Sequence, residues 1–455
     1  MYLILWQSFI LRIAAIVTEP KKPQATITDR KSLYSGFFKL EELTIDMDKH
    51  DGTSETVKRI HFERGHAVGI LAYDAQRDQV LMVNEMRPGM LAAGDYPFND
   101  SLPAGMIDKG ETHIDAALRE TEEETEQLLA DPVTIHKGAY VSAGGTSEKI
   151  ALVMGKVDLS KAGGVHGKQG EGENIKTVIL SADEFIERAH DGRIKDMKTL
   201  VSAFWFANHR DELRDPNAKP AADVDAKITD VFAPKKQPAP PQAEIKSREM
   251  LYDGVFKIEQ LTVEQDKHDG GKLELKRLNF ERGDAIAILG YDPKRDEVVL
   301  VNEMRTGMLA AGDYPYSDTV PAAMLKKGED LLAAAADRLT RETGLALQGA
   351  SVIHPGAYVS AGGSTEKIAL VTGIVDSSNA GGVRGRAGIG EDIKTVVISS
   401  DEFIARAEDG RLTDMKSLAM AFWLAQNRDG IKAKANAPEP KKPPASLAHK
   451  IAGLG

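Results

Sequence analysis

The sequence predicts an α/β protein of two tandem domains, each an α/β/α sandwich built around a mixed sheet. One observation is an internal repeat, because the segments that begin at Leu33 and Phe62 return at Leu251 and Phe280, 218 positions later. Each copy spans about 180 residues, the size of a whole domain rather than of a solenoid unit. The other observation is that short apolar runs alternate with helical stretches within a copy. A sheet with helices on both faces buries both kinds of element.

The repeat and the composition divide the chain into five parts. They are an apolar N-terminal segment with a Pro/Lys linker (1–31), the first domain (32–212), a Pro-rich linker (213–248), the second domain (249–430) and a Pro/Lys-rich tail (431–455). Pro-rich stretches are semi-extended spacers. The N-terminal apolar run is interrupted by Gln7, Ser8 and Arg12 and is short for a membrane span. A non-native start, a packing helix and a membrane association stay open for it.

Within the first copy, the period of the apolar residues assigns the elements. Apolar runs predict strands over Ala67–Tyr73 and Gln79–Met86. Helical spacing predicts helices over His113–Leu129, Ser181–His190 and Lys198–His209. The same elements are expected 218 positions later.

Composition excludes several classes of function. Of the 455 residues, 42% are hydrophobic and 28% charged, as in ordinary globular proteins. The net charge of −11 argues against non-specific nucleic-acid binding. There is no cysteine, which excludes disulfides and thiolate chemistry and fits the reducing cytosol, so we expect a cytoplasmic protein.

One acidic stretch, GMIDKGETHIDAALRETEEETEQ from Gly105 to Gln127, carries the chemistry. On a helix, Glu120, Glu123 and Glu124 lie three and four positions apart and share one face, where like charges repel. A divalent cation would remove that cost, and carboxylates are ligands for Mg2+, with Mn2+ as the alternative. Arg119 is placed to pair with Glu111 in the preceding loop.

The stretch resembles the Nudix hydrolase signature, G-x5-E-x7-R-E-U-x-E-E-x-G-U, in which U is aliphatic. Gly105, Glu111, Arg119 and the three helix glutamates fall on its positions. Three positions depart from it, since Thr121, Glu126 and Gln127 stand where an aliphatic residue, a glycine and an aliphatic residue are usual. These departures affect the packing and the end of the helix and remove no ligand.

Further segments resemble the ADP-ribose pyrophosphatase family over nearly all of each copy: FERGH, EMR, LPAG, GGTSE and GVHGKQGEGENI. The resemblance implies metal ligation by the Ala104 carbonyl, Glu120, Glu124 and Glu173, with Glu123 assisting. It implies Glu171 as the general base. It implies that Arg87, Ser142 and Glu148 hold the diphosphate and terminal ribose, and that Arg59, Arg64 and the Phe37–Phe38 pair hold the nucleotide end.

The reaction implied is Mg2+-dependent hydrolysis of ADP-ribose to AMP and ribose 5-phosphate. The family usually has SPGG where this chain has SAGG from Ser142 to Gly145, which leaves other nucleoside diphosphate sugars such as GDP-mannose open. The alternative of another class is a nucleotide-sugar sensor or scaffold without turnover. The glutamates of the signature favour an enzyme, because a sensor does not need them.

The second copy has lost most of the motif, whose positions there hold Ala323, Glu329, Asp337, Arg338, Arg341 and Glu342. In the later loop, Ile389 replaces Glu171, whereas Glu391 keeps the place of Glu173. We therefore expect catalysis in the first domain only. The i, i+4 pairs Asp337–Arg341 and Arg338–Glu342 predict a helix that is stable without metal.

The second copy nevertheless keeps arginines that the first copy would use to hold substrate. Members of the family form dimers, so the resemblance implies an intramolecular pseudo-dimer of the two copies. Copy two would then lend Phe256, Arg277 and Arg282 to the first site. The alternative is that common descent and salt bridges alone account for the retained arginines. A regulatory nucleotide in copy two and further homo-oligomers stay open.

Overall fold

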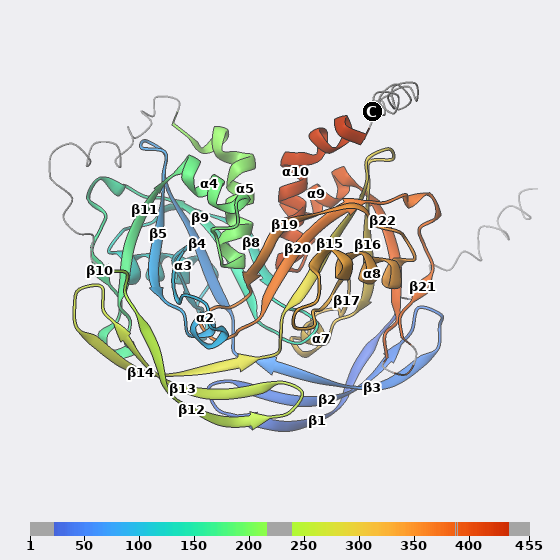
Figure 1. Cartoon of the computed structure of the whole chain (residues 1–455), viewed down its shortest axis with the longest axis horizontal. Coiled ribbons are helices and arrows are strands. Elements are labelled where there is room, and N and C mark those ends of the chain that lie inside the picture. Colours follow the sequence, from blue (N-terminus) through green and yellow to red (C-terminus); the bar gives the residue numbers. More distant parts are fainter. Residues whose placement is uncertain (1–21, 216–238, 387, 389, 436–455) are drawn as a thin grey trace, which may run out of the picture.

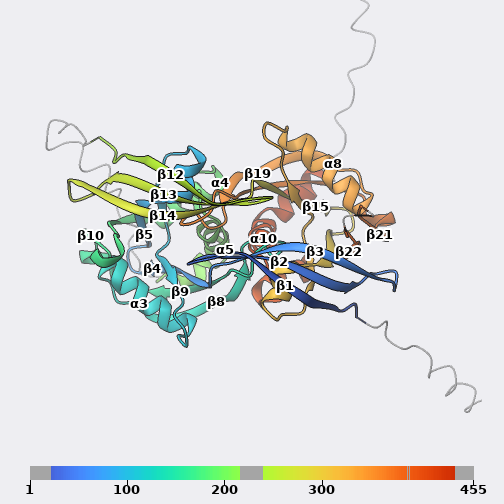
Figure 2. The same ribbon diagram turned by 90° about the horizontal axis from the view of Figure 1, so that it is seen from below.

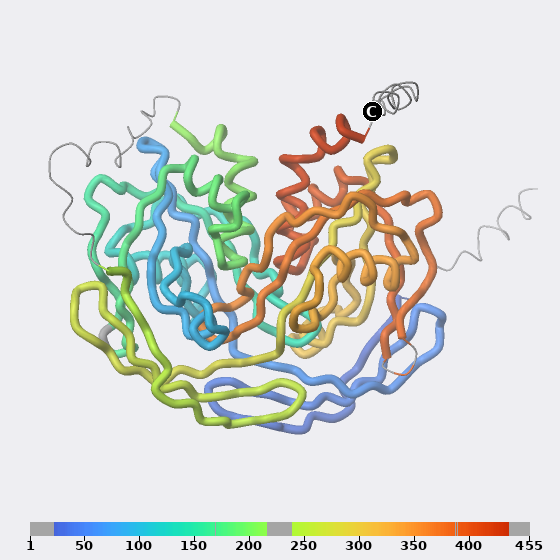
Figure 3. Tube along the Cα trace, viewed as in Figure 1, coloured from blue at the N-terminus to red at the C-terminus, as the bar shows by residue number. Residues whose placement is uncertain are grey.

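The computed structural model describes residues 22–215, 239–386, 388 and 390–435. The expectations for the apolar N-terminus, for most of the linker and tail, and for Ile389 lie outside the described residues. Two domains of one architecture stand side by side (Figure 1), and the tube of the chain shows the same path twice (Figure 3). The predicted fold of two mixed-sheet α/β domains is confirmed.

The first domain is organised by an eight-stranded sheet with the path β10-β11-β5-β4-β9-β8, in which β6 pairs with β5 and β7 with β4. Strands β4 and β9 are parallel and the other pairs antiparallel. The strands are β4 (Ala67–Asp74), β5 (Gln79–Met86), β6 (Phe98–Ser101), β7 (Ala104–Met106), β8 (Ala130–Tyr140), β9 (Lys149–Lys156), β10 (Val165–His166) and β11 (Ile175–Ser181).

Helices cover both faces of this sheet. Helix α3 packs Ala116 and Ala117 against Val68, Ile70 and Val153 on one face. Helices α4 and α5 pack on the other face, over a core that includes the fully buried Phe185 and Phe204. The helices are α2 (Pro88–Ala93), α3 (His113–Thr125), α4 (Ala182–His190) and α5 (Met197–Leu213), with short 3-10 turns η1 (Leu159–Lys161) and η2 (Gln169–Glu171).

The second domain repeats this plan, with sheet path β19-β20-β15-β16-β22-β21. Its strands are β15 (Ala285–Asp292), β16 (Glu297–Met304), β17 (Tyr316–Thr319), β18 (Ala322–Met324), β19 (Gln348–Tyr358), β20 (Lys367–Ile374), β21 (Val383–Arg384) and β22 (Ile393–Ser399). Its helices are α7 (Thr306–Ala310), α8 (Leu331–Thr343), η3 (Ser377–Asn379), α9 (Ser400–Glu408) and α10 (Met415–Ala435).

Each domain also has an antiparallel three-stranded sheet, and each of these sheets lies against the other domain. They are β1 (Ala25–Ser35), β2 (Lys39–Asp48) and β3 (Ser54–Glu63), and β12 (Ala243–Asp253), β13 (Lys257–Asp266) and β14 (Lys272–Glu281). Leu43 and Ile45 of β2 pack against Met304 and Leu309 of the second domain. The two sheets cross beneath the domains (Figures 1 and 2). Each domain therefore presents residues of its three-stranded sheet to the other domain's loops.

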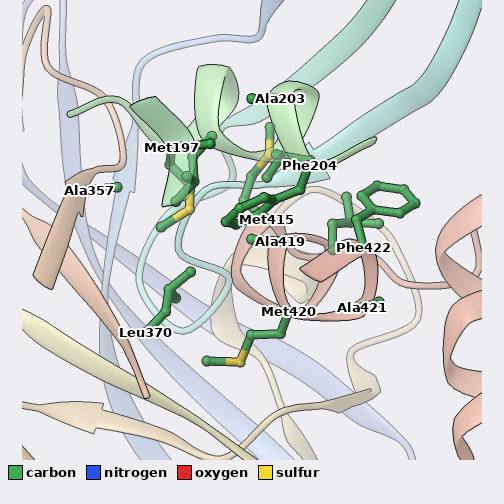
Figure 4. Close-up of a cluster of buried hydrophobic side chains, with 14 of the residues drawn as sticks. Met197, Ala203, Phe204, Ala357, Leu370, Met415, Ala419, Met420, Ala421 and Phe422 are labelled. Atoms are coloured by element: carbon green, nitrogen blue, oxygen red, sulfur yellow. The ribbon is translucent and has the colours of Figure 1, made fainter. Parts of the chain in front are cut away.

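Helices α5 and α10 pack against each other between the domains. Their buried faces belong to one hydrophobic cluster that includes side chains of both eight-stranded sheets. Figure 4 shows Met197 and Phe204 of α5 gathered with Met415 of α10 in that cluster. Near the crossing sheets, the rings of Phe62 and Phe280 stack at 4.0 Å and 4°. The contact between the domains is apolar at both places.

The predicted helices and strands of the first domain are present with shifted ends. The first acidic helix ends at Thr125, not Leu129, because Glu126 adopts a left-handed backbone with φ 55° and stops it. The domains begin earlier than expected, with β1 at Ala25 and β12 at Ala243, since Pro-rich composition marks a linker but not where pairing starts. Within the described residues, no helix is long and apolar enough to cross a membrane.

Candidate active site

The acidic helix α3 is fixed at its start and along its buried side. The Thr112 side chain accepts a hydrogen bond from the Asp115 amide and caps the helix, whose Ala116 and Ala117 are fully buried. Glu124 is only 4% exposed, and its Oε2 accepts a hydrogen bond from the Ala104 amide at 3.1 Å. Helix α3 is thereby held against strand β7.

Gly105 allows this approach of strand and helix. A Cβ at this position would lie 1.9 Å from Glu120 Oε1, so any other residue would displace that carboxylate. The glycine of the motif thus serves close packing beside the acidic face.

Arg119 forms hydrogen bonds with three glutamates of the acidic face. Its Nε donates to Glu111 Oε1 at 2.8 Å, and its Nη2 donates to the Met106 carbonyl at 2.9 Å, so the ion pair expected from the sequence is present. Its Nη1 also donates to Glu120 at 2.6 Å and to Glu123 at 3.1 Å, which the spacing did not predict. The Arg119 guanidinium lowers the pKa of Glu111 to about 2. Arg119 therefore both holds the loop and neutralises two glutamates of the helix.

Burial opposes the charged form of three carboxylates of the site, including Glu120 despite its bond to Arg119. Burial raises the pKa of Glu120, Glu124 and Glu173, and nearby carboxylates such as Glu85 raise the pKa of Glu124 and Glu173 further. Such a set of hard oxygen donors fits a divalent cation such as Mg2+. In the described part of the chain, no three acidic or histidine side chains are gathered as a ready-made metal site. Arg119 and Lys168, whose Nζ lies 3.0 Å from Glu123, supply the positive charge instead.

The loop that carries Glu171 and Glu173 touches both domains. Glu173 Oε2 accepts from the Lys168 amide at 2.9 Å, while the Glu171 side chain is 61% exposed and so is open to solvent. From strand β14 of the second domain, Arg277 Nη2 donates to the Glu171 carbonyl at 3.0 Å. A Cβ on Gly172 would lie 2.3 Å from Leu275. The second domain therefore packs directly on this loop, as the expected lending of Arg277 requires.

Arg64 and Glu148 meet a residue of the second domain. Arg64 Nη1 donates to Ser360 Oγ at 2.6 Å, and Ser360 Oγ donates to Glu148 at 3.0 Å. Glu148 is 2% exposed, and burial raises its pKa. Arg87 pairs with Glu85 and donates to Ser101 at 2.6 Å. The sequence analysis did not predict that Ser360 lies here. Ser360 belongs to the second copy, and no local pattern shows that its loop reaches the first domain.

Three residues expected in the first domain's cleft lie at the second domain instead. Ser142 accepts from Arg282 at 2.7 Å and donates to Glu366 at 3.0 Å. Arg59 donates to the Gly390 carbonyl at 2.9 Å. Ser142 and Arg59 differ from expectation because their loop and their three-stranded sheet reach across to the other copy. Arg282 differs because it stays beside Glu366 of its own domain, 3.4 Å away.

The aromatic residues are also placed differently from expectation. Phe38 is 2% exposed and packs edge-on against Phe62 at 5.0 Å, with Arg64 over its ring. Phe256 lies in the same cluster, 5.5 Å from Phe280. Neither ring offers a fully open face for a nucleotide base, whereas Phe37 is 71% exposed.

In the second domain, the counterpart helix α8 has a rebuilt ion-pair set. Arg338 donates to Glu329 at 3.0 Å and to Asp337 at 2.7 Å, and so takes over the loop contact that Arg119 makes in the first domain. The expected Asp337–Arg341 pair is present at 3.7 Å, but Arg338 turns to the loop rather than to Glu342. Glu342 is 4% exposed, and burial raises its pKa to about 8.

Comparisons with known proteins agree with the motif. The model of the NUDIX domain family matches residues 63–144. The chain is 32% identical over 196 residues to an ADP-ribose pyrophosphatase of Escherichia coli (strain K12), covering 42% of this chain and 92% of that protein. It is 32% identical over 190 residues to an ADP-ribose pyrophosphatase of Haemophilus influenzae, covering 40% of this chain and 84% of that protein.

Two further similarities are more distant. A GDP-mannose pyrophosphatase of Escherichia coli (strain UTI89) is 27% identical over 183 residues, covering 39% of this chain and 92% of that protein. A solved structure described as an ADP compounds hydrolase is matched with a TM-score of 0.33 and 15% identity, over 43% of this chain and 97% of that one.

Proposed function

We propose that this chain, which belongs to the Nudix hydrolase family and is a Nudix diphosphatase acting on nucleotide sugars, hydrolyses ADP-ribose to AMP and ribose 5-phosphate in its first domain. The observation that carries the proposal is the first acidic helix. Its glutamates stand with Gly105 and Arg119 in the signature arrangement, beside a loop with two further carboxylates. The two 32% identical relatives are ADP-ribose pyrophosphatases.

In this mechanism the chain's own residues bind, orient and move a proton. Arg64 and Arg87 would neutralise the diphosphate, and Glu148 would accept hydrogen bonds from the terminal ribose. Glu171, whose side chain is exposed, would take the proton from the attacking water. Arg119 positions Glu120 and Glu123.

A divalent cation is part of the proposal, with Mg2+ ahead of Mn2+. The Ala104 carbonyl, Glu120, Glu124 and Glu173 would hold it, and Glu123 would assist. When bound, such an ion neutralises phosphate charge and makes water more acidic. The burial of Glu124 and the raised pKa of Glu120 and Glu173 are what a cation would relieve.

We further propose that the two domains act as a pseudo-dimer within one chain and that only the first hydrolyses substrate. The crossing sheets and the contact of Arg277 with the Glu171 loop support the first point. The arginines at positions 338 and 341, where the first domain has glutamates, support the second.

Matched variants test catalysis in the first domain only. Glu124 and Glu342 occupy corresponding positions and are both 4% exposed. We expect Glu124→Gln to lower kcat on ADP-ribose with Mg2+ by about 100-fold or more, because loss of a ligand should cost at least as much as the roughly 10–100-fold loss seen for partners of ligands. Glu342→Gln should leave kcat unchanged. Equal losses in the two variants would contradict the assignment to one domain.

GDP-mannose hydrolysis is the second candidate, favoured by the 27% identical relative and by the SAGG sequence at Ser142. A panel of ADP-ribose, GDP-mannose and ADP-glucose, assayed by phosphatase-coupled phosphate release with Mg2+, separates the two. A higher kcat/KM on GDP-mannose than on ADP-ribose would make GDP-mannose the assigned substrate, and the assigned reaction, diphosphate hydrolysis, would stay the same. Hydrolysis of none of them would refute both.

A further inference from the structure

The second domain has a cleft of about 590 Å3 at the position of the lost acidic face. The Ser142–Gly144 segment of the first domain forms part of its wall, so both domains build it. Seven basic and five acidic side chains line it, which gives a formal charge of +2. The positions 218 residues earlier hold five basic and seven acidic side chains, a charge of −2. The cleft and the corresponding positions of the first domain thus have formal charges of opposite sign.

The difference comes from four positions on one wall of the cleft. Lys326, Arg338 and Arg341 replace an aspartate and two glutamates, and Asp337 replaces an arginine. Arg338 is held by Glu329 and Asp337 and is 8% exposed, so the reversal of charge is built into the fold of α8. A solvated surface helix would not need such a buried guanidinium.

Several arginines in the cleft keep unmet hydrogen-bond donors. Arg305 is 8% exposed, and its Nε is buried without a partner although its other nitrogens meet Glu303 and Thr319. The Nε of Arg282 is also buried without a partner. Arg341 approaches Asp337 and Glu342 at 3.7 Å each, too far for a hydrogen bond. Arg341 is the most exposed of the three, at 33%, so an anion in the cleft would supply acceptors that its donors can reach.

We propose that this cleft is a binding site for a diphosphate group that needs no divalent metal. Guanidinium groups bind phosphate oxygens through paired N–H donors, so Arg305 and Arg341 can take over the charge neutralisation that a cation provides in the first domain. A diphosphate presents several acceptor oxygens, which suits a cleft lined by arginines from different elements. The site binds and does not hydrolyse, and its existence does not depend on which nucleotide sugar the first domain splits.

The test is isothermal titration of the full chain in EDTA with inorganic pyrophosphate and, separately, with ADP. EDTA removes the cation that the first cleft would need, so one equivalent of either probe reports the second cleft. We expect both probes to bind with a stoichiometry of one, and Arg341→Glu to weaken each by about tenfold or more, since it reverses one contact charge. Glu123→Gln, the same position in the first domain, should leave both isotherms unchanged.

Four outcomes would overturn the proposal. They are no binding of either probe in EDTA, binding of ADP without pyrophosphate, equal binding by Arg341→Glu and the unaltered chain, and weakening by Glu123→Gln. If Arg341→Glu unfolds, as its melting curve would show, Arg341→Gln replaces it with the same expected direction. Hydrolysis of ADP-ribose with Mg2+, measured on the same preparations, reports the first domain separately.

Discussion

Removal of the Arg277 side chain tests whether the first domain's activity depends on the second domain. This side chain comes from strand β14 and donates to the Glu171 carbonyl at 3.0 Å and to the Gly172 carbonyl at 3.4 Å. Both carbonyls belong to the loop that carries the proposed general base. Arg277→Ala removes both bonds and leaves the Glu171 carboxylate itself intact, so Arg277 acts as a positioning residue.

The size of the effect follows from these two bonds. A hydrogen bond from a charged donor contributes about 1.5–3 kcal/mol. Arg277 is half-buried and its second bond is long, so the lower value of about 1.5 kcal/mol is appropriate for the pair. If the loop must be ordered in the transition state, kcat/KM falls by about tenfold. The fall should be mainly in kcat, because the loop positions the base rather than the nucleotide.

The assay is steady-state hydrolysis of ADP-ribose with Mg2+, and the matched control is Arg59→Ala. Arg59 is the corresponding residue of the first copy and donates to the Gly390 carbonyl of the second domain at 2.9 Å. We expect Arg59→Ala to retain wild-type kcat. Wild-type kcat in Arg277→Ala, or an equal loss in Arg59→Ala, would refute the reasoning.

Three further predictions concern stability. Glu126→Gly should raise the free energy of unfolding by about 1 kcal/mol in urea denaturation, because Glu126 holds φ 55° where the second copy has Gly344; no gain would mean that other contacts offset the strain. Phe280→Ala should cost about 3 kcal/mol or more, since its ring is buried and stacked on Phe62, whereas Phe37→Ala, 71% exposed, should cost little. Burial lowers the pKa of His354 to about 4, so below pH 6.5 the unfolded chain binds a proton that the folded chain refuses. The free energy of unfolding should then fall by up to about 1.4 kcal/mol per pH unit between pH 6.5 and 4. The contribution of neutral His354 to stability is complete above pH 6.5 and is lost as the pH falls to 4. His354→Gln should flatten the melting temperature over this window, and an unchanged slope would contradict the assignment.

Local patterns predicted the elements of each domain, but not how the domains exchange parts. The apolar runs at Ala67–Asp74 and Gln79–Met86 predict strands from local sequence alone, and both strands are present. The stop at Glu126 was not predicted, because its left-handed backbone is unusual for glutamate. The crossing of the three-stranded sheets depends on contacts between residues more than 200 positions apart, such as Leu43 with Met304, which no local pattern encodes.

The contacts of the candidate site fall into the same two groups, those between neighbours in sequence and those between the domains. Residues that act through neighbours in sequence, such as Arg119 with Glu111, were predicted with the correct partner. Of the residues that act across the two domains, Arg277 was expected at the loop that it contacts, whereas Ser142 and Arg59 were assigned to the wrong side. In a dimer of identical chains both assignments would be equivalent, since each site receives the same residues. In a chain with two unlike copies, the direction of exchange decides which site a residue serves.

The second acidic stretch is best understood as rebuilt rather than decayed. Random loss of the motif would leave Glu329 without the arginine that its counterpart Glu111 has, because position 337 is now aspartate. Instead, Arg338 stands one position later and restores the bridge to Glu329 at 3.0 Å. That single shift keeps the loop tied to the helix and replaces a carboxylate of the metal face by a guanidinium. Loop geometry is therefore retained while the sign of the charge changes, as expected of a cleft that still binds an anion.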